Sequence, residues 1–248
     1  MATRAPTGQT AAYLVGQSNS LLVDPAAWTE QLAAAAREAD VGHVAVTHHH
    51  PDHVGGVADA AAALDCTVWA RAGRVSAFEA ATGVVPDRTF GADTIIPAAS
   101  GVSVLDTPGH AAEHVGFVCG DEIVSGDVAV AEGSVVVGAP DGEMRAYLST
   151  LRRLHARNPG RLHPAHGPVI DRPRDVCRRL IQHRIDRERA VARAVSDGAR
   201  TIGEIVDAAY EKDISTVRDL ARATVVAHVE KLVVENRLAR DGHRVLPA

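Results

Sequence analysis

The sequence predicts a layered α/β fold followed by a smaller, mainly helical domain. Strand and helix patterns alternate over the first 70 or so residues, and a strand-rich stretch from Thr94 to Val137 precedes a helical pattern from Gly142 to Ala156. Such an order is typical of packed sheet and helix layers. Near Arg172 the composition changes to long, arginine-rich helical patterns. We therefore expect one domain over residues 1–171 and a second over residues 172–248.

The first elements alternate between strand and helix. Tyr13–Gly16 and Ser20–Asp24 are short apolar runs joined by polar residues, which indicates a hairpin. Trp28–Ala39 has apolar residues at helical spacing. His43–Val46 then predicts a buried strand that leads directly into a histidine-rich motif.

This motif concentrates side chains that bind metals. Residues 47–56 are Thr-His-His-His-Pro-Asp-His-Val-Gly-Gly, with candidate ligands at His48, His50, Asp52 and His53. Buried without a metal, each imidazole and carboxylate would need its own hydrogen-bond partner. Imidazole with carboxylate suits zinc, iron or manganese, and the lack of thiolates argues against a structural zinc finger. The alternative is a polar loop that is merely rich in histidine.

Two further elements follow the motif. Val54–Leu64 predicts a helix, opened by Gly55 and Gly56, which would let the backbone approach the metals closely. Thr67–Ala70 predicts another strand.

Three more candidate ligands each follow a strand-like run and stand beside Gly or Pro. Loops of this kind at the ends of strands commonly carry the chemistry of a sheet scaffold. Singly they are ordinary turn residues, but together they complete a ligand set. They are His110 after Val102–Asp106, Asp127 after Glu122–Val124, and His166 after Arg161–His163.

The C-terminal stretch predicts helix, helix and hairpin after a long connecting helix at Asp175–Ser196. In the shorter helix of Ala199–Val206, Thr201 and Glu204 form a capping-box pattern. Ser215–Asn236 predicts the next helix, and Arg237–Leu246 a hairpin about Asp-Gly. This order is typical of a winged helix.

In this order the metal motifs resemble those of the metallo-β-lactamase superfamily. The resemblance implies an αββα four-layer sandwich with two divalent metal ions at one edge, with zinc as the first choice and iron or manganese as alternatives. One ion would be held by His48, His50 and His110, the other by Asp52, His53 and His166, and Asp127 would bridge them. His49 would point away. Of the histidines without a ligand position, His114 and His163 are near enough in sequence to support the ligands.

Two further segments are similar to a narrower branch of the superfamily. These are Ala139–Met144 with Tyr147-Leu148, and the pattern His183-Arg184-x-x-Arg187-Glu188. The branch contains β-lactamase-like proteins with a C-terminal winged-helix-like domain, some of which are single-strand endoribonucleases. Ala12 stands where relatives usually have Asn, and the residues after Asp127 lack a common glycine. Both departures weaken any transfer of substrate more than the transfer of metal binding.

The charge of the C-terminal stretch bears on nucleic-acid binding. From Arg178 to Ala248 there are 14 basic and 11 acidic residues, a net charge of +3, whereas the remaining 12 basic and 20 acidic residues give −8. A charge of +3 is well below a strong nucleic-acid footprint. We favour the alternative that these helices cap the catalytic domain, shape its cleft or pair subunits in a homodimer.

The sequence also predicts a cellular location. Cys66, Cys119 and Cys177 are odd in number and widely spaced, as expected of buried thiols in a reducing compartment. The first residues lack the apolar core of a signal peptide, and no run of about 18 apolar residues could span a membrane. We expect a cytoplasmic protein without membrane partners.

The predicted activity follows from the metals. Two ions about 3.5–4 Å apart would share a water and lower its pKa towards about 7, with Asp52 orienting the nucleophile or passing a proton. We expect a binuclear metallohydrolase that acts on an ester, thioester, lactone or similar bond of a small molecule. The alternative is an endoribonuclease that cuts single-stranded RNA. A DNA-binding regulator with a vestigial metal site is a third class, against which the intact ligand set argues.

Overall fold

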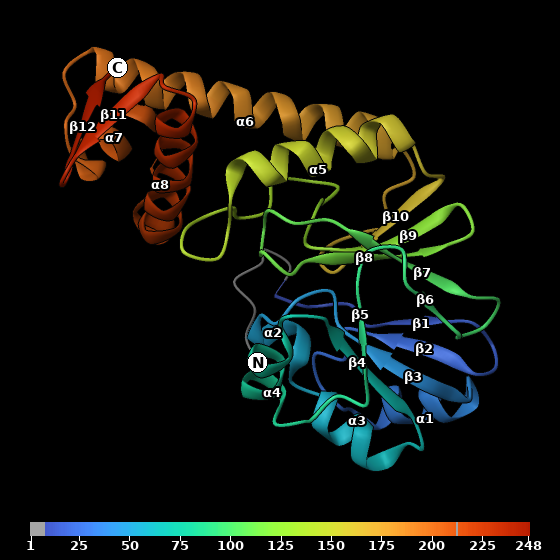
Figure 1. Ribbon diagram of the computed structural model, residues 1–248. Coiled ribbons are helices and arrows are strands. Elements are labelled where there is room, and N and C mark those ends of the chain that lie inside the picture. The colour runs from blue at the N-terminus through green and yellow to red at the C-terminus, as the bar shows by residue number, and fades with distance from the viewer. Residues whose placement is uncertain (1–7, 212) are drawn as a thin grey trace. The chain divides into compact units, whose positions relative to one another are not determined.

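The computed structural model describes residues 8–211 and 213–248, which fold into two compact units (Figure 1). Unit 1 comprises the described residues up to Thr107, together with Glu113–Gly133 and Asn158–Pro173. Unit 2 comprises Pro108–Ala112, Ser134–Arg157 and the described residues from Arg174 onward. The domain boundary after residue 171 stays a prediction.

Unit 1 contains two five-stranded sheets (Figure 1). In the first, β1 and β2 form an antiparallel hairpin and β2 to β5 are parallel; in the second, all pairs are antiparallel except β9 with β10. The first sheet runs in the order β1 (Tyr13–Val15), β2 (Ser20–Val23), β3 (Val41–Ala45), β4 (Thr67–Arg71) and β5 (Arg88–Phe90). The second runs in the order β10 (Arg161–Pro164), β9 (Glu122–Gly126), β8 (Val115–Cys119), β7 (Val102–Asp106) and β6 (Ile95–Ile96).

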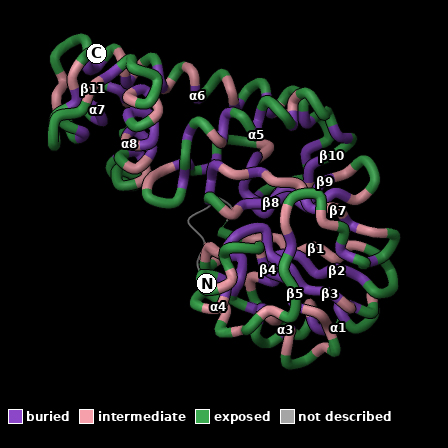
Figure 2. The backbone as a smooth tube through the Cα atoms, in the orientation of Figure 1, coloured by how far each residue is buried: buried purple, intermediate pink, exposed green. Residues whose placement is uncertain are grey.

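The main core of unit 1 lies between these sheets. One buried cluster joins Leu21 and Trp69 of the first sheet with Val104 and Phe117 of the second. Phe90 and Phe117 meet edge to face with ring centroids 6.0 Å apart. Figure 2 shows the buried backbone following the strands. Burial of this cluster from water holds the two sheets, and hence the loops at their edges, in place.

Four helices complete unit 1, of which α1 and α3 pack on β3, and α4 packs on β4. The N-terminus of α1 is capped by the Thr29 hydroxyl, which accepts a hydrogen bond from the Leu32 amide. The sequence did not predict α4, and the strand-rich stretch expected up to Val137 ends at Gly126. The helices are α1 (Glu30–Glu38), α2 (Pro51–Val54), α3 (Val57–Ala63) and α4 (Val75–Thr82).

The helix predicted over Val54–Leu64 is wrong in its first turn, because α2 ends and α3 begins on either side of Gly55 and Gly56. A Cβ atom at Gly55 would lie 2.5 Å from the Ala26 carbonyl oxygen, and one at Gly56 would lie 2.7 Å from the Pro25 carbonyl oxygen. The two glycines therefore let the chain approach the loop after β2, and this packing accounts for them without the metals.

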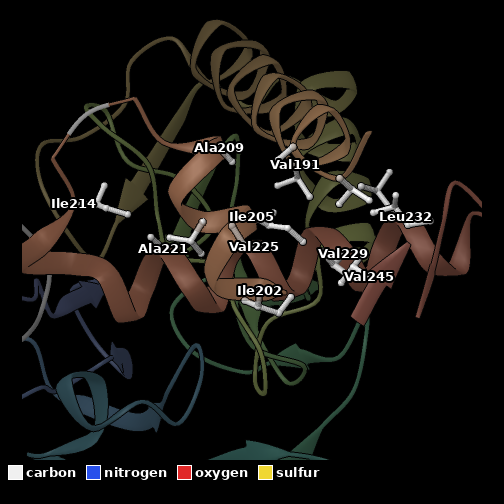
Figure 3. Close-up of a cluster of buried hydrophobic side chains, with 14 residues drawn as sticks. Val191, Ile202, Ile205, Ala209, Ile214, Ala221, Val225, Val229, Leu232 and Val245 are labelled. Atoms are coloured by element: carbon white, nitrogen blue, oxygen red, sulfur yellow. The ribbon is translucent and has the colours of Figure 1, made fainter. Parts of the chain in front are cut away.

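Unit 2 is mainly helical. One core cluster joins α6, α7, α8 and the hairpin, and Figure 3 shows Val191, Ile205, Val225 and Val245 among its side chains. The predicted capping box is confirmed, since the Thr201 side chain and Glu204 form both of its hydrogen bonds. The elements are α5 (Met144–Arg157), α6 (Pro173–Ser196), α7 (Ile202–Ala209), the 3₁₀ turn η1 (Ser215–Val217), α8 (Arg218–Val234), β11 (Leu238–Asp241) and β12 (Arg244–Pro247). Across residues 8–211 and 213–248, each helix is too short or too polar to cross a membrane.

Candidate metal centre

The histidine motif lies at the carboxyl end of β3, a strand that pairs in parallel with β2 and β4. Pro51 stands in the first turn of α2, where its missing N–H costs nothing. The strand end and the short helix together bring His48 and Asp52 each close to His53. His49 instead lies 5.8 Å from the Phe78 ring and 3.5 Å from Glu113, away from the other motif side chains as expected.

Two ligand groups of unit 1 share His53. In each group the ligand atoms lie within 4.8 Å of one another. The His53 Nε2 atom is 3.7 Å from an Asp127 carboxylate oxygen, and the His166 Nε2 atom is 3.4 Å from the other. The groups are His48, His53 and Asp127, and Asp52, His53 and His166.

Two of these imidazoles are oriented by hydrogen bonds at Nδ1, the ring nitrogen that does not face the other candidate ligands. The His53 Nδ1 atom lies 2.9 Å from a carboxylate oxygen of Asp24, and the His166 Nδ1 atom lies 2.8 Å from the Gln9 carbonyl oxygen. Both partners are acceptors, so each Nδ1 carries a proton, and each Nε2 is the atom that faces Asp127. Such partners behind a ligating histidine are typical of metal sites.

His48 and His50 point ring nitrogens at each other. The His48 Nε2 atom lies 2.9 Å from the His50 Nδ1 atom. The other nitrogen of His48, Nδ1, lies 3.1 Å from the Thr47 hydroxyl. Two imidazole nitrogens brought this close suit a shared cation as well as they suit a shared proton.

His53 tests whether this donor set fits a metal. The residue is completely buried, and its Nε2 atom has no hydrogen-bond partner among the described residues. Burial lowers the pKa of His53, but the carboxylates of Asp24 and Asp127 outweigh burial and raise the pKa to about 10. Burial likewise opposes, and Asp127 drives, the raised pKa of His166. This group of side chains therefore favours positive charge, which a divalent metal would supply in place of the extra proton on His53.

Asp127 is held through its backbone. Its amide donates to His114 Nε2 at 3.0 Å, and His114 Nδ1 lies 2.8 Å from the Thr107 hydroxyl. Gly126 adopts φ 50°, where a Cβ atom would lie 2.6 Å from the Thr47 hydroxyl. Of the two histidines that the sequence marked as supporting, His114 thus supports a candidate ligand, whereas His163 pairs with Glu122 at 2.6 Å.

The remaining predicted ligand, His110, belongs to unit 2. Its Nδ1 atom lies 2.6 Å from the Val136 carbonyl oxygen. Gly109 beside it has φ 135°, and a Cβ atom there would lie 2.3 Å from the Tyr147 backbone. The hydrogen bond to Val136 therefore orients the His110 ring within unit 2.

Sequence reasoning missed Asp24. This residue closes β2, is almost fully buried and adopts the left-handed φ of 51°. It accepts hydrogen bonds from the Thr47 amide and hydroxyl, both at 2.7 Å, as well as from His53. An Asp followed by Pro after an apolar run was the available signal, but the same pattern is common in turns.

Comparisons with known proteins found a matching family model and similar relatives. The family model described as the metallo-beta-lactamase superfamily matches residues 5–166. The lactamase-like protein aptB of Emericella nidulans is 29% identical over 247 residues, which span 91% of this chain and 75% of the relative.

Two solved structures are similar as well. The metallo-beta-lactamase family protein TTHA1429 from Thermus thermophilus has 21% identity and a TM-score of 0.81, covering 100% of this chain and 97% of that protein. This likeness confirms the predicted fold class. TTHA1623, in a di-iron-bound form, has 31% identity and a TM-score of 0.56 over 68% of this chain and 92% of that protein.

Proposed function

Because the chain belongs to the metallo-β-lactamase superfamily, we propose that it is a binuclear metallohydrolase acting on an ester, thioester, lactone or similar bond of a small molecule. The observation that carries the proposal is the convergence of six ligand-capable side chains of unit 1, with His53 and His166 oriented by hydrogen bonds from behind. They are His48, His50, Asp52, His53, Asp127 and His166.

We assign the ligands as the family resemblance implies. One ion would be held by His48, His50 and His110 and the other by Asp52, His53 and His166, and Asp127 would serve both. The place of Asp127 supports its shared role, because it groups with His48 and its carboxylate oxygens also lie 3.7 Å from His53 Nε2 and 3.4 Å from His166 Nε2. The relative in a di-iron-bound form supports divalent metals, and this ligand set accepts zinc, iron or manganese. Zinc is our first choice.

The chain's own residues then have distinct tasks. Divalent metals held by these residues would make hydroxide available near neutral pH and would polarise the bond to be cut. Asp52 is only half-buried, so its carboxylate is placed to orient the attacking water and to receive its proton. Asp24 keeps His53 in the correct tautomer, and His114 fixes the backbone of Asp127.

A small-molecule substrate is favoured over RNA because the basic residues of unit 2 are largely engaged within it. The guanidinium groups of Arg184, Arg187 and Arg200 donate to backbone carbonyl oxygens. In α8, Thr224, Val225, Ala227 and His228 are buried, so this face of the helix is not free to read nucleic acid. Ion pairs with carboxylates engage Arg178, Arg189, Arg218, Lys231 and Arg237.

The cytoplasmic location and the homodimer remain predictions from the sequence.

The decisive test joins metal analysis with turnover on one purified sample. We expect two divalent metals per chain by elemental analysis. We also expect hydrolysis of at least one member of a panel of chromogenic esters, thioesters and lactones, abolished by a chelator and restored by metal. Labelled single-stranded RNA should remain intact.

Two variants sharpen this test. His53→Ala and Asp52→Ala should each lower turnover by about 100-fold or more with the circular dichroism spectrum unchanged, because each removes a ligand in the proposed centre. His243→Ala, at the exposed hairpin turn, is the matched control and should retain full activity. Near-normal rates for His53→Ala would refute the assignment, and chelator-sensitive RNA cleavage would favour the nuclease instead.

A further inference from the structure

We propose that Thr47 is a positioning residue that couples the two metal positions through its hydroxyl group. The inference rests on the proposed metal centre and extends it to a residue that binds no metal itself. Thr47 is 1% exposed and directly precedes His48.

Thr47 and His53 share one carboxylate. The Thr47 amide donates to one oxygen of Asp24 at 2.7 Å, and the Thr47 hydroxyl donates to the other oxygen at 2.7 Å. That second oxygen also accepts the Nδ1 proton of His53 at 2.9 Å. A change in the position of the hydroxyl therefore changes the bond that orients His53.

The same hydroxyl determines the tautomer of His48. A threonine hydroxyl has a single proton, and this one is given to Asp24. Towards His48 Nδ1, at 3.1 Å, the hydroxyl oxygen can then only accept. His48 Nδ1 must carry the proton, which leaves Nε2 with a lone pair directed at His50. One hydroxyl thus orients a proposed ligand of each metal: His48 directly and His53 through Asp24.

The surrounding backbone keeps the hydroxyl in place. The Thr47 carbonyl oxygen accepts from the Val115 amide at the start of β8 at 2.9 Å. Gly126, which directly precedes Asp127, packs so closely that a Cβ atom there would lie 2.6 Å from the Thr47 hydroxyl and 2.8 Å from the Thr47 Cβ. Thr47 therefore stands where the segments that carry Asp24, His48 and Asp127 meet. Metal binding that orders one of these segments lowers the ordering cost at the other, which is positive coupling.

The test compares Thr47→Val, which keeps the shape and loses the hydroxyl, with Thr47→Ser, which keeps the hydroxyl. Stepwise binding of Zn²⁺ is measured against a chromophoric chelator, and Co²⁺ absorption reports the ligand geometry. We expect Thr47→Val to bind metal about 10- to 100-fold more weakly and its two stepwise affinities to move apart. Thr47→Ser should stay close to the wild type in both. Circular dichroism and thermal unfolding of the chelated proteins check the fold.

Wild-type stepwise affinities in Thr47→Val would overturn the proposal. Equal losses in the Val and Ser variants would overturn it too, since packing of the methyl group would then explain the effect. A measurement on the metal-free wild type needs no variant: ¹⁵N spectra of the imidazoles should show His48 with its proton on Nδ1, and an Nε2-protonated His48 would refute the argument. Wild-type protein that binds two metals but hydrolyses no substrate would overturn the proposed function alone.

Discussion

At the residue scale, the metal centre depends on groups that lie behind its candidate ligands. Asp24 combines two costly features, a buried carboxylate and a left-handed backbone. Its three hydrogen bonds to Thr47 and His53 offset that cost. The strained residue is therefore the one that orients the candidate ligand His53.

Asp24→Asn should weaken metal binding by about 10- to 100-fold. The amide adopts the same backbone conformation but removes the negative charge that helps to raise the pKa of His53. Metal affinity by competition with a chelator checks this outcome. Asp93→Asn, at an exposed position with φ 61°, is the matched control, and equal behaviour of the two variants would contradict a special role for Asp24.

At the scale of elements, the break between α2 and α3 decides how the motif is held. Gly56 donates its amide to the carbonyl oxygen of Pro25 at 2.7 Å, and Pro25 directly follows Asp24 in the loop after β2. The loop that carries Asp24 and the helix that carries His53 are thereby packed backbone to backbone. A side chain at either glycine would collide with the backbone of this loop, so the close packing requires glycine at both positions.

Gly56→Ala should lower the free energy of unfolding by about 1–3 kcal/mol, because its Cβ atom would overlap backbone atoms that cannot rotate away. Gly91→Ala is the control, since a Cβ atom there has no neighbour within 4 Å among the described residues. Urea unfolding of both variants measures the difference. A Gly56→Ala protein as stable as Gly91→Ala would show that the loop adjusts freely.

At the scale of the whole molecule, unit 2 contains a buried charged network. Glu188 pairs with Lys231 at 2.6 Å and with Arg237 at 2.7 Å. His228 beside it is fully buried, and both its ring nitrogens lack hydrogen-bond partners among the described residues. Burial foremost, then Arg184, Lys231 and Arg187, lower the pKa of His228 to about 3. The network thus keeps a neutral imidazole inside a largely basic setting.

Because of this lowered pKa, the free energy of unfolding of unit 2 should decrease at acidic pH. The unfolded chain takes up a proton on His228 near pH 6.5, whereas the folded chain does so only near pH 3, so stability is lost as the pH falls from about 6.5 towards 3. One such group costs about 2 kcal/mol between pH 7 and pH 5. His228→Leu should remove that part of the loss in urea unfolding, while His243→Leu at an exposed site should not. A pH dependence unchanged in His228→Leu would refute the assignment.

The sequence alone determined the features that depend on near neighbours. The hairpin of β1 and β2, the capping box at Thr201 and the turn at Gly242 follow from local backbone preferences. The spacing from His48 to His53 likewise places its ligands together because strand and helix geometry act over a few residues. These local features were enough to predict the fold class and the candidate ligands, given the family resemblance.

Tertiary structure alone decided which distant residues stand behind those ligands. Asp24, Gln9 and His114 reach His53, His166 and Asp127 through strand pairing and loop packing, and no spacing rule encodes such contacts. The sequence could not separate His114 from His163, since both are histidines near a candidate ligand. Their roles differ because one faces the backbone of Asp127 and the other faces Glu122. That direction is set by the pairing register of β8, β9 and β10, which depends on the packing of both sheets.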